Sequence, residues 1–405
     1  MADGGSGGRW LNRTVLGAGT ASFWSDVAHE MATAVLPLVA AGLGPPALVL
    51  GAAEGIADAM SGAAKLLSGW WSDRLARRKP LAVAGYVVTA ISTALLGAAG
   101  RAWEMAAARS AAWIGRGVRT PARNALLAGG VPAAHFGKAF GFERSMDTAG
   151  AVVGPFLAAA LIGAMPVRAL LSWTLLPGLL AAAAMAFLVR ETPRQAAPPR
   201  PLLGSLAALP PPFRRYLLAV GLFGMGDFAH SLLILRAIEI LTPSLGAARA
   251  AVSAMTLYGL HNAAGALLAV VFGAAGDRHG RQRVLAFSYL LGPLMIGLLL
   301  IPATGNAARG GVLLAAAFLV GGALLAAEDA LENAAAAEIL AETQRGTGFG
   351  SLAAVNSAGD LVSSLAVGLL WKAFGPVAAF GATLVPMLGG ALLLLANLAR
   401  RGGAR

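Results

Sequence analysis

Cysteine is absent from the 405 residues of this chain, and charged residues make up only 12% of it. The first absence excludes disulfide bonds and thiol chemistry. The second sets the chain apart from soluble domains, because 57% of its residues are hydrophobic and its mean hydropathy is +0.71. Phosphate-cradling loops, nucleophile elbows and paired zinc motifs are missing too, so we expect no enzyme, no cofactor and no direct use of ATP.

Apolar runs long enough to cross a bilayer fill the chain instead. A membrane helix needs about 20 residues, and these runs lack the alternation of barrel strands. Their many Ala and Gly residues suit helices that pack closely in lipid. We therefore predict an all-α polytopic membrane protein with twelve transmembrane helices, at about 14–42, 47–69, 80–99, 103–127, 139–164, 167–190, 214–240, 249–275, 283–302, 310–336, 346–373 and 377–399.

The net charge of +12 is concentrated in alternate connections between these runs. Lys and Arg cluster after the second and eighth runs, around the chain centre and at the C-terminus, and Lys138 and Arg345 follow the fourth and tenth runs. By the positive-inside rule, this bias predicts that both termini and the middle loop are cytoplasmic. We interpret the basicity as membrane topology, with no nucleic-acid partner.

Three sequence matches relate the first half of the chain to the second. Gly69 and Asp73 precede a basic cluster, as do Gly273 and Asp277. The other matches pair 137–150 with 346–359, and Asp26-Val-Ala-His29 with Asp227-Phe-Ala-His230. A proline-rich stretch near the midpoint reads as an extended linker. We predict homologous six-helix bundles over 1–190 and 214–405, joined by a cytoplasmic linker over 191–213.

The repeated connector resembles the loop signature of the major facilitator superfamily, and the likeness covers essentially the whole chain. The first copy has Ala76 where that family usually has glycine, whereas the second keeps Gly280. The resemblance implies a gating loop whose aspartate faces a helix N-terminus or an arginine and holds the halves together. In the alternative, the basic residues anchor the loop to anionic lipid. The gating-loop candidates are Gly69, Asp73, Arg74, Arg77, Arg78, Gly273, Asp277, Arg278, Gly280 and Arg281.

Gly141, Gly150, Gly154 and Pro155 resemble the antiporter signature on helix five of bacterial proton-driven exporters. Glycines at this spacing allow close helix packing, and the proline removes a backbone hydrogen bond and permits a bend. The resemblance implies a hinge between open states. The alternative is a packing seam with no bearing on transport direction.

Ionisable residues inside the runs are costly in hydrocarbon and persist mostly where they face a cavity or a partner. Asp26 and Glu30 are four residues apart, on one helical face with His29 beside them. Two carboxylates that share an apolar site hold protons more readily than carboxylates in water, as proton coupling requires. The proton-coupling candidates are Asp26, Glu30, Glu54 and Asp58, and the cavity or substrate candidates are His29, Met31, Asp227, His230, Arg236 and His261.

The fourth run carries a basic face made of Arg116, Arg119 and Arg123. We expect these arginines to pair with acids of neighbouring runs, the alternative being attraction of an anionic substrate. The adjacent charges Glu143/Arg144 and Glu328/Asp329 lie near the cytoplasmic side, where we expect ion pairs between the two halves.

We predict a monomeric secondary transporter in a bacterial inner membrane, whose partners are lipid, protons and a small-molecule substrate. It would export that substrate against proton entry by alternating access. A first alternative is a divalent metal transporter, in which Asp26, His29, Asp227 and His230 converge on the ion. A second is a sensor or assembly factor that keeps the fold without transport.

Overall fold

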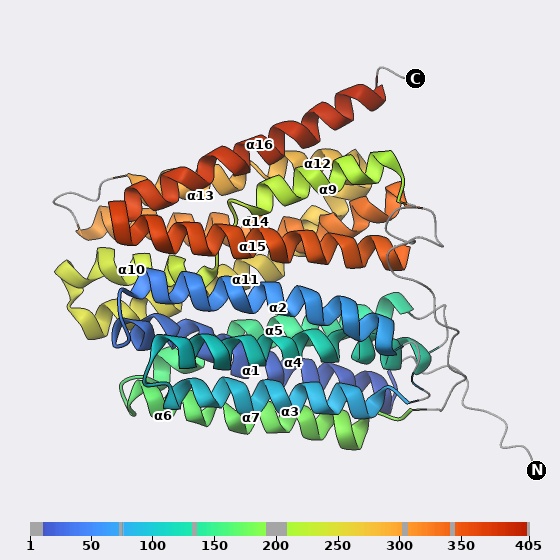
Figure 1. Ribbon diagram of the computed structural model, residues 1–405, viewed down its shortest axis with the longest axis horizontal. Coiled ribbons are helices and arrows are strands. Elements are labelled where there is room, and N and C mark those ends of the chain that lie inside the picture. The colour runs from blue at the N-terminus through green and yellow to red at the C-terminus, as the bar shows by residue number, and fades with distance from the viewer. Residues whose placement is uncertain are drawn as a thin grey trace, which may run out of the picture.

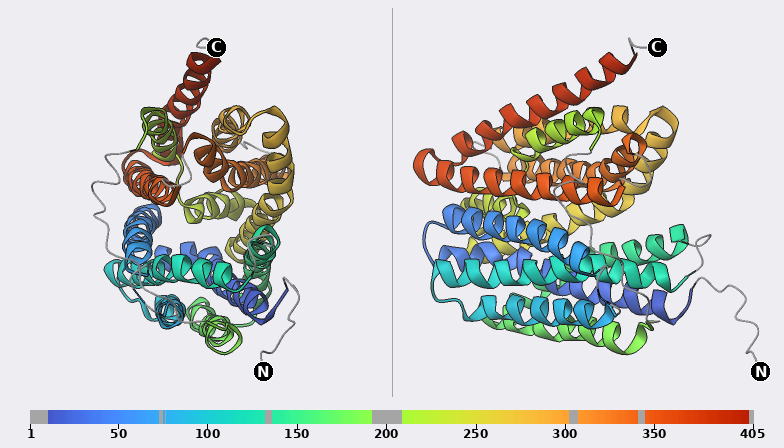
Figure 2. Two further views of the ribbon diagram at one scale, coloured as in Figure 1. Left: turned by 90° about the vertical axis from the view of Figure 1, so that its right-hand side faces the viewer. Right: turned by 45° about the vertical axis from the view of Figure 1, so that its right-hand side comes forward.

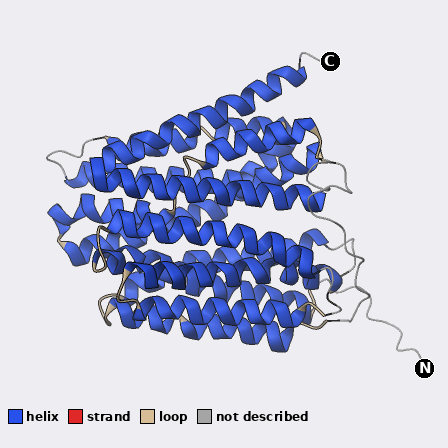
Figure 3. Cartoon of the chain, in the orientation of Figure 1, coloured by secondary structure: helices blue, strands red, loops and turns tan. Residues whose placement is uncertain are grey.

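The computed structural model describes residues 11–72, 75, 77–131, 136–191, 209–301, 307–340 and 345–402, and all regular structure among them is helical (Figure 3). Backbone polar groups have no water to bond in lipid, so apolar spans of this length form helices. Asn12 caps the first of them, because its side chain accepts hydrogen bonds from the backbone N–H groups of Thr14 and Val15.

The N-terminal half contains the helices up to residue 188. They are α1 (Arg13–Ala41), α2 (Pro46–Ser72), α3 (Lys79–Leu95) with the short η1 (Leu96–Ala98), α4 (Ala102–Gly129), α5 (Phe136–Leu161), α6 (Val167–Trp173), α7 (Leu175–Ala183) and the π-helical turn η3 (Ala184–Leu188).

The C-terminal half begins at α9, inside the linker that the sequence predicts; residues 192–208 of that linker lie outside the described part. Its helices are α9 (Pro211–Gly224), α10 (His230–Leu245), α11 (Ala247–His279), α12 (Arg281–Ser288), α13 (Leu291–Leu300), α14 (Ala307–Ile339), α15 (Arg345–Phe374) and α16 (Pro376–Gly402).

The long helices run side by side along one direction, with the first half of the chain on one side and the second half on the other (Figures 1 and 2). The start of α1 and the end of α16 lie at the same end of the bundle, which we call the terminal face; the other end is the opposite face (Figure 1). Each predicted span corresponds to one helix or to consecutive helices, so the prediction of twelve spans in two halves is confirmed.

Eight spans within the described part are long and apolar enough to cross a membrane by length and composition. The four that do not meet this measure are α1, α4, α5 and the pair α9–α10. Several of the ionisable side chains discussed below belong to these four spans.

The predicted seventh span is broken, which the sequence reading missed. The chain leaves α9 at Gly224 and enters α10 at His230, with Asp227 between them. Side chains of α15 bond the freed backbone: the Ser363 hydroxyl donates to the Asp227 carbonyl, and the Ala229 N–H donates to the Ser364 hydroxyl. The break places Asp227 inside the protein rather than on a helical face.

A seam of small residues joins the two halves along α2 and α15. A Cβ atom on Gly51 would lie 2.2 Å from the carbonyl oxygen of Ser364, and one on Gly368 would lie 2.7 Å from that of Ala47. Only glycine permits this approach, because real Cβ contacts are never so short. The halves are therefore in backbone contact toward the opposite face.

Candidate functional site

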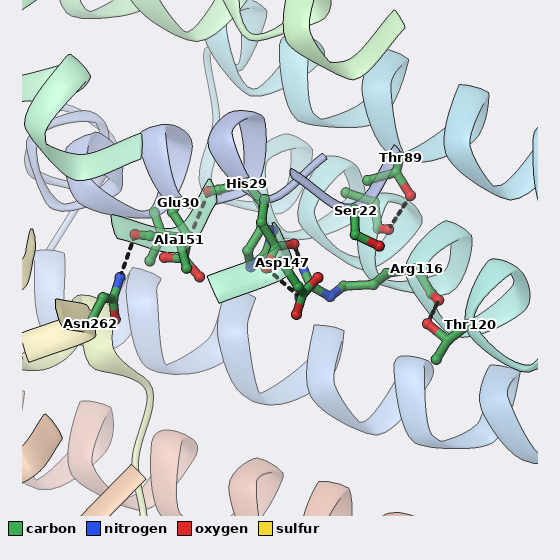
Figure 4. A network of polar contacts seen from close by, with 12 residues as sticks. Ser22, His29, Glu30, Thr89, Arg116, Thr120, Asp147, Ala151 and Asn262 are labelled. Atoms are coloured by element: carbon green, nitrogen blue, oxygen red, sulfur yellow. Dashed lines mark hydrogen bonds and ion pairs between the residues drawn. The ribbon is translucent and has the colours of Figure 1, made fainter. Parts of the chain in front are cut away.

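Asp26 on α1 pairs with Arg116 on α4, across the interior of the N-terminal half. The closest guanidinium nitrogen is 2.9 Å from Oδ1, and a second nitrogen donates to Oδ2 over 3.3 Å. Figure 4 shows Arg116 in the polar network near His29 and Asp147. His29 packs its ring edge-on against Trp113 at 4.9 Å. The site of Asp26 therefore contains an arginine in addition to the neighbouring acid Glu30.

Glu30 contacts the other half of the protein. The hydroxyl of Tyr258 on α11 donates to Glu30 Oε2 over 2.6 Å. Among the described residues, no cation forms an ion pair with Glu30. One helical turn thus separates an acid paired with arginine from an acid held by a neutral hydroxyl.

Asn262, one turn after Tyr258 on α11, makes a second bond between the halves. Its side-chain amide donates to the Ala151 carbonyl on α5 over 2.9 Å (Figure 4). The two bonds lie on adjacent turns of α11, so this helix contacts both α1 and α5 of the other half.

Glu54 on α2 is held by Arg109 on α4, a residue that we did not assign from the sequence. The guanidinium donates to both carboxylate oxygens, over 2.9 and 3.0 Å, and also to the Thr33 hydroxyl over 3.0 Å. Bidentate pairs of this kind fix geometry as well as charge. The sequence feature that points to Arg109 is its position, because a charged residue inside a predicted span needs a partner. Asp58, one turn along α2, has no ion pair among the described residues.

The basic face of α4 divides into three different environments. Arg116 pairs with Asp26, as described, and Arg123 pairs with Glu143 at 2.7 Å, with Ser22 bonded to both. Arg119 is 1% exposed and lies over the Tyr86 ring, 4.1 Å from its centroid. The sequence reading placed Glu143 between the halves, which is wrong, since Arg123 belongs to the same half.

At the terminal face, Arg144 on α5 forms an ion pair with Asp329 on α14. Arg144 also contacts Asp147 of its own helix at 3.2 Å. This is the ion pair between halves that the sequence reading expected for Arg144 and Asp329. Glu328 does not join it and faces the cavity described next.

A small cavity lies within the C-terminal half at the break between α9 and α10. Its volume is about 10 Å³, and its lining includes Asp227, His230, His261 and Glu328. His230 and His261 lie with ring centroids 4.6 Å apart. From the sequence we predicted Asp227, His230 and His261 as cavity residues but not Glu328. The sequence feature that points to Glu328 is an acid inside a predicted span.

Two further cavity candidates lie elsewhere. Met31 is 2% exposed and belongs to the hydrophobic core. Arg236 lies 3.5 Å from Glu239 on its own helix, α10. Neither residue lines the cavity.

The predicted gating loops are described only in part. Asp73, Arg74 and Ala76 lie outside the described residues, as does the side chain of Asp277. Gly280 joins α11 to α12 with a φ of 93°, a left-handed conformation that glycine adopts without strain. Arg281 lies 3.5 Å from Glu338 on α14, within one half. The other described members are Gly69 in α2, Gly273 and Arg278 in α11, and Arg77 and Arg78 before α3.

The hinge candidates on α5 form a packing seam with α1. A Cβ atom on Gly150 would lie 2.3 Å from the Phe23 carbonyl oxygen, and one on Gly154 would lie 2.8 Å from Met31 N. A Cβ atom on Gly141 would meet nothing within 4 Å. Pro155 follows the seam inside α5. Close packing therefore explains two of the three glycines.

The residues of the metal alternative do not converge. Asp26 and His29 lie in the N-terminal half with an arginine and a tryptophan as neighbours, whereas Asp227 and His230 lie at the break in the other half. Within the described part of the chain, no group of three or more His, Asp or Glu residues is arranged to hold a metal ion.

Comparison with known proteins agrees with this architecture. The chain is 28% identical over 395 residues to an uncharacterized MFS-type transporter of Methanocaldococcus jannaschii, covering 95% of each chain. It is also 28% identical over 389 residues to an uncharacterized protein of Mycobacterium tuberculosis, covering 89% of this chain and 87% of that one.

Solved transporters share the fold. The nucleoside transporter NupG superposes with a TM-score of 0.74 at 14% identity, over 95% of this chain and 99% of that one. A peptide transporter POT in complex with sulfate superposes with a TM-score of 0.76 at 14% identity, over 96% of this chain and 95% of that one. The sequence profile described as Major Facilitator Superfamily matches residues 18–236 and 216–404. With two six-helix halves and a profile match across both, the chain belongs to the major facilitator superfamily and is a multi-pass membrane transporter.

Proposed function

We propose that this transporter exports a small molecule in exchange for protons, and that Glu30 is the acid that carries the proton. The hydrogen bond from Tyr258 to Glu30 is the observation that supports this most directly. It joins an acid without an arginine partner in the described part to the helix of the other half. A change in the charge of Glu30 therefore acts on the contact between the halves.

The neighbouring acids suit other roles. Asp26 pairs with Arg116 and Glu54 pairs with Arg109, so each of these acids already has a positively charged partner. Hydrogen bonds to an ionised acceptor are roughly twice as strong as neutral ones. Protonation of Glu30 thus weakens the bond from Tyr258, and loss of the proton on the other side of the membrane restores it.

The proposal includes the setting of the protein. Alternating access moves the two halves around a site between them. The seam along α2 and α15 closes the halves toward the opposite face, and the pair of Arg144 with Asp329 links them at the terminal face. We propose that the terminal face lies in the cytoplasm of a bacterium, which the basic connections support, and that the protein acts as a monomer in the inner membrane.

The test follows the distance between the halves as the pH changes. The chain lacks cysteine, so cysteines introduced at Gly129 and His279, exposed on different halves at the terminal face, carry the only spin labels. Electron–electron resonance on the reconstituted protein gives the distance distribution in mildly acidic and mildly alkaline buffer. We expect the populations to shift with pH, and Glu30→Gln to abolish the shift.

Glu104→Gln is the matched control, because the Glu104 carboxylate accepts a backbone N–H from Gly100 and an amide oxygen still does so. It should shift like the parent. A full pH response in Glu30→Gln, or none in the parent, refutes the assignment. Once a substrate is known, transport in proteoliposomes that survives both collapse of the pH gradient and Asp26→Asn with Glu30→Gln would refute proton coupling altogether.

A further inference from the structure

The cavity at the break of the seventh span has an unusual polar lining. Asp227 lies in the break itself, Glu328 approaches from α14, and His261 approaches from α11. A volume of about 10 Å³ is room for about one water molecule or a group of similar size. Polar side chains from the break and from two helices thus line a space for one small head group.

When both acids are ionised, the free polar atoms on these three side chains are all acceptors. His261 Nδ1 lies 3.0 Å from the Phe318 carbonyl oxygen, which only accepts, so Nδ1 carries the proton. In the neutral ring Nε2 is then an acceptor; this side chain is 1% exposed, and its Nε2 has no hydrogen-bond partner among the described residues. The carboxylates of Asp227 and Glu328 also have no hydrogen bond or ion pair there.

Among the described residues, no lysine or arginine lines this cavity. The other half is different, because arginine pairs with Asp26, with Glu54 and with Glu143. Among the described residues, the acids of this cavity therefore lack the basic partner that the buried acids of the other half have.

We propose that this cavity binds the protonated amine of the transported molecule. An ammonium group supplies a positive charge and several N–H donors, which two carboxylates and an imidazole acceptor match. Apart from His230, the rest of the lining is apolar, with Phe228, Leu233, Met295 and Leu324, and suits carbon attached to the amine. A bare metal ion fits less well, since no metal-holding group is arranged among the described residues.

The amine site is connected to the proposed proton acid. His261 stacks with Tyr258 at 5.8 Å between ring centroids, and Tyr258 bonds Glu30. Tyr258 therefore contacts the amine site through its ring, which stacks on His261, and contacts the proton acid Glu30 through its hydroxyl. This inference names the substrate class and rests on the transport function proposed above, but its test measures binding alone.

Calorimetry on the purified full chain in detergent compares probes that differ in head group. The probes are methylamine and 2-phenylethylamine, with 3-phenylpropanoate and 2-phenylethanol as matched anionic and neutral compounds, and heats from empty micelles are subtracted. We expect binding of at least one amine, with the anion and the alcohol weaker by at least about tenfold. Equal binding of charged and uncharged probes, or no binding of either amine, overturns the proposal.

Variants locate the binding. Glu328→Gln and Asp227→Asn should each weaken the amine by about tenfold or more, because each removes a charged acceptor. Glu328→Asp keeps the negative charge and should lose less amine affinity than Glu328→Gln. Glu338 is an exposed acid near the end of the same helix, so Glu338→Gln should bind the amine as the parent does. Melting temperatures identify any variant that has failed to fold, and amine affinity unchanged in folded Glu328→Gln and Asp227→Asn refutes the site.

The two proposals fail separately. Amine binding at constant pH, together with distances between halves that do not respond to pH, supports this site and refutes proton exchange through Glu30. If Glu30→Gln abolishes the pH response and no amine binds selectively, proton exchange through Glu30 is supported and the amine site is refuted.

Discussion

Tyr258 on α11 donates its hydroxyl to Glu30 on α1, and these residues belong to different halves of the transporter. Tyr258 is 2% exposed, so its hydroxyl has little access to water as an alternative partner. Leaving a buried polar group unpaired costs about 1–3 kcal/mol. The bond therefore contributes to the balance between conformations in which the halves meet here and those in which they part.

Tyr258→Phe should uncouple the halves from the charge of Glu30. The ring keeps its place beside His261, while the hydroxyl is lost. We expect the pH-dependent shift in the distance between the labels at Gly129 and His279 to fall sharply. The control is Tyr216→Phe, which removes a hydroxyl that bonds a backbone carbonyl within the C-terminal half. An equal loss of response in both variants would contradict the role of Tyr258.

The bidentate pair of Arg109 and Glu54 should stabilise the N-terminal half. Arg109→Met leaves a buried carboxylate unpaired, and breaking such a pair costs about 3–5 kcal/mol. We expect a large drop in the melting temperature measured in detergent. The double variant Arg109→Met with Glu54→Leu should regain much of it, because no unpaired charge then remains. A double variant less stable than Arg109→Met would argue against this account.

The glycine seam should be required for closure at the opposite face. Gly51→Val adds a Cβ atom whose ideal position lies only 2.2 Å from the Ser364 carbonyl oxygen. The helices α2 and α15 therefore have to separate. Overpacking of this kind costs about 1–3 kcal/mol. Spin labels at Ala41 and Leu245, at the opposite-face ends of α1 and α10, should report longer distances.

Gly141→Ala is the control for the seam, since a Cβ atom there meets nothing within 4 Å. This variant should match the parent in distances and in melting temperature. If Gly51→Val left the opposite-face distances unchanged, the seam would not control closure.

The ion pair of Arg144 and Asp329 should bias the terminal face toward closure. Both side chains are about half exposed, so the pair is worth about 0.2–1 kcal/mol. Even 1 kcal/mol changes a two-state ratio about fivefold. We expect Asp329→Asn to favour longer distances between Gly129 and His279.

Salt provides an independent check on this pair. Raising the salt concentration screens exposed charges, so it should lengthen the same distances in the parent and have little effect in Asp329→Asn. Glu338→Gln, which alters a surface acid within one half, should respond to salt as the parent does. Identical salt responses in the parent and in Asp329→Asn would show that another contact holds this face.

The positions of the spans could be predicted from the sequence, whereas most pairings between side chains could not. The length of the apolar runs placed α2 and α11 within a few residues of their observed bounds. Asp26 and Glu30 share a helical face, yet one contacts an arginine and the other a tyrosine. Local spacing says which side chains share a face, and it says nothing about which helix packs against that face. The hydrophobic pattern offered little help, because Ala-rich helices are apolar on every side.

By itself the sequence determined the membrane setting, the helical class and the twofold repeat, because lipid admits few backbone solutions and a duplicated chain repeats its motifs. Only the tertiary structure decided which buried acids are neutralised. Arg109, Arg116 and Arg123 reach Glu54, Asp26 and Glu143 from another helix, whereas Asp227 and Glu328 are left facing a cavity. The physical reason is that the state of a buried charge depends on the groups within a few ångströms of it, and helices distant in sequence supply those groups.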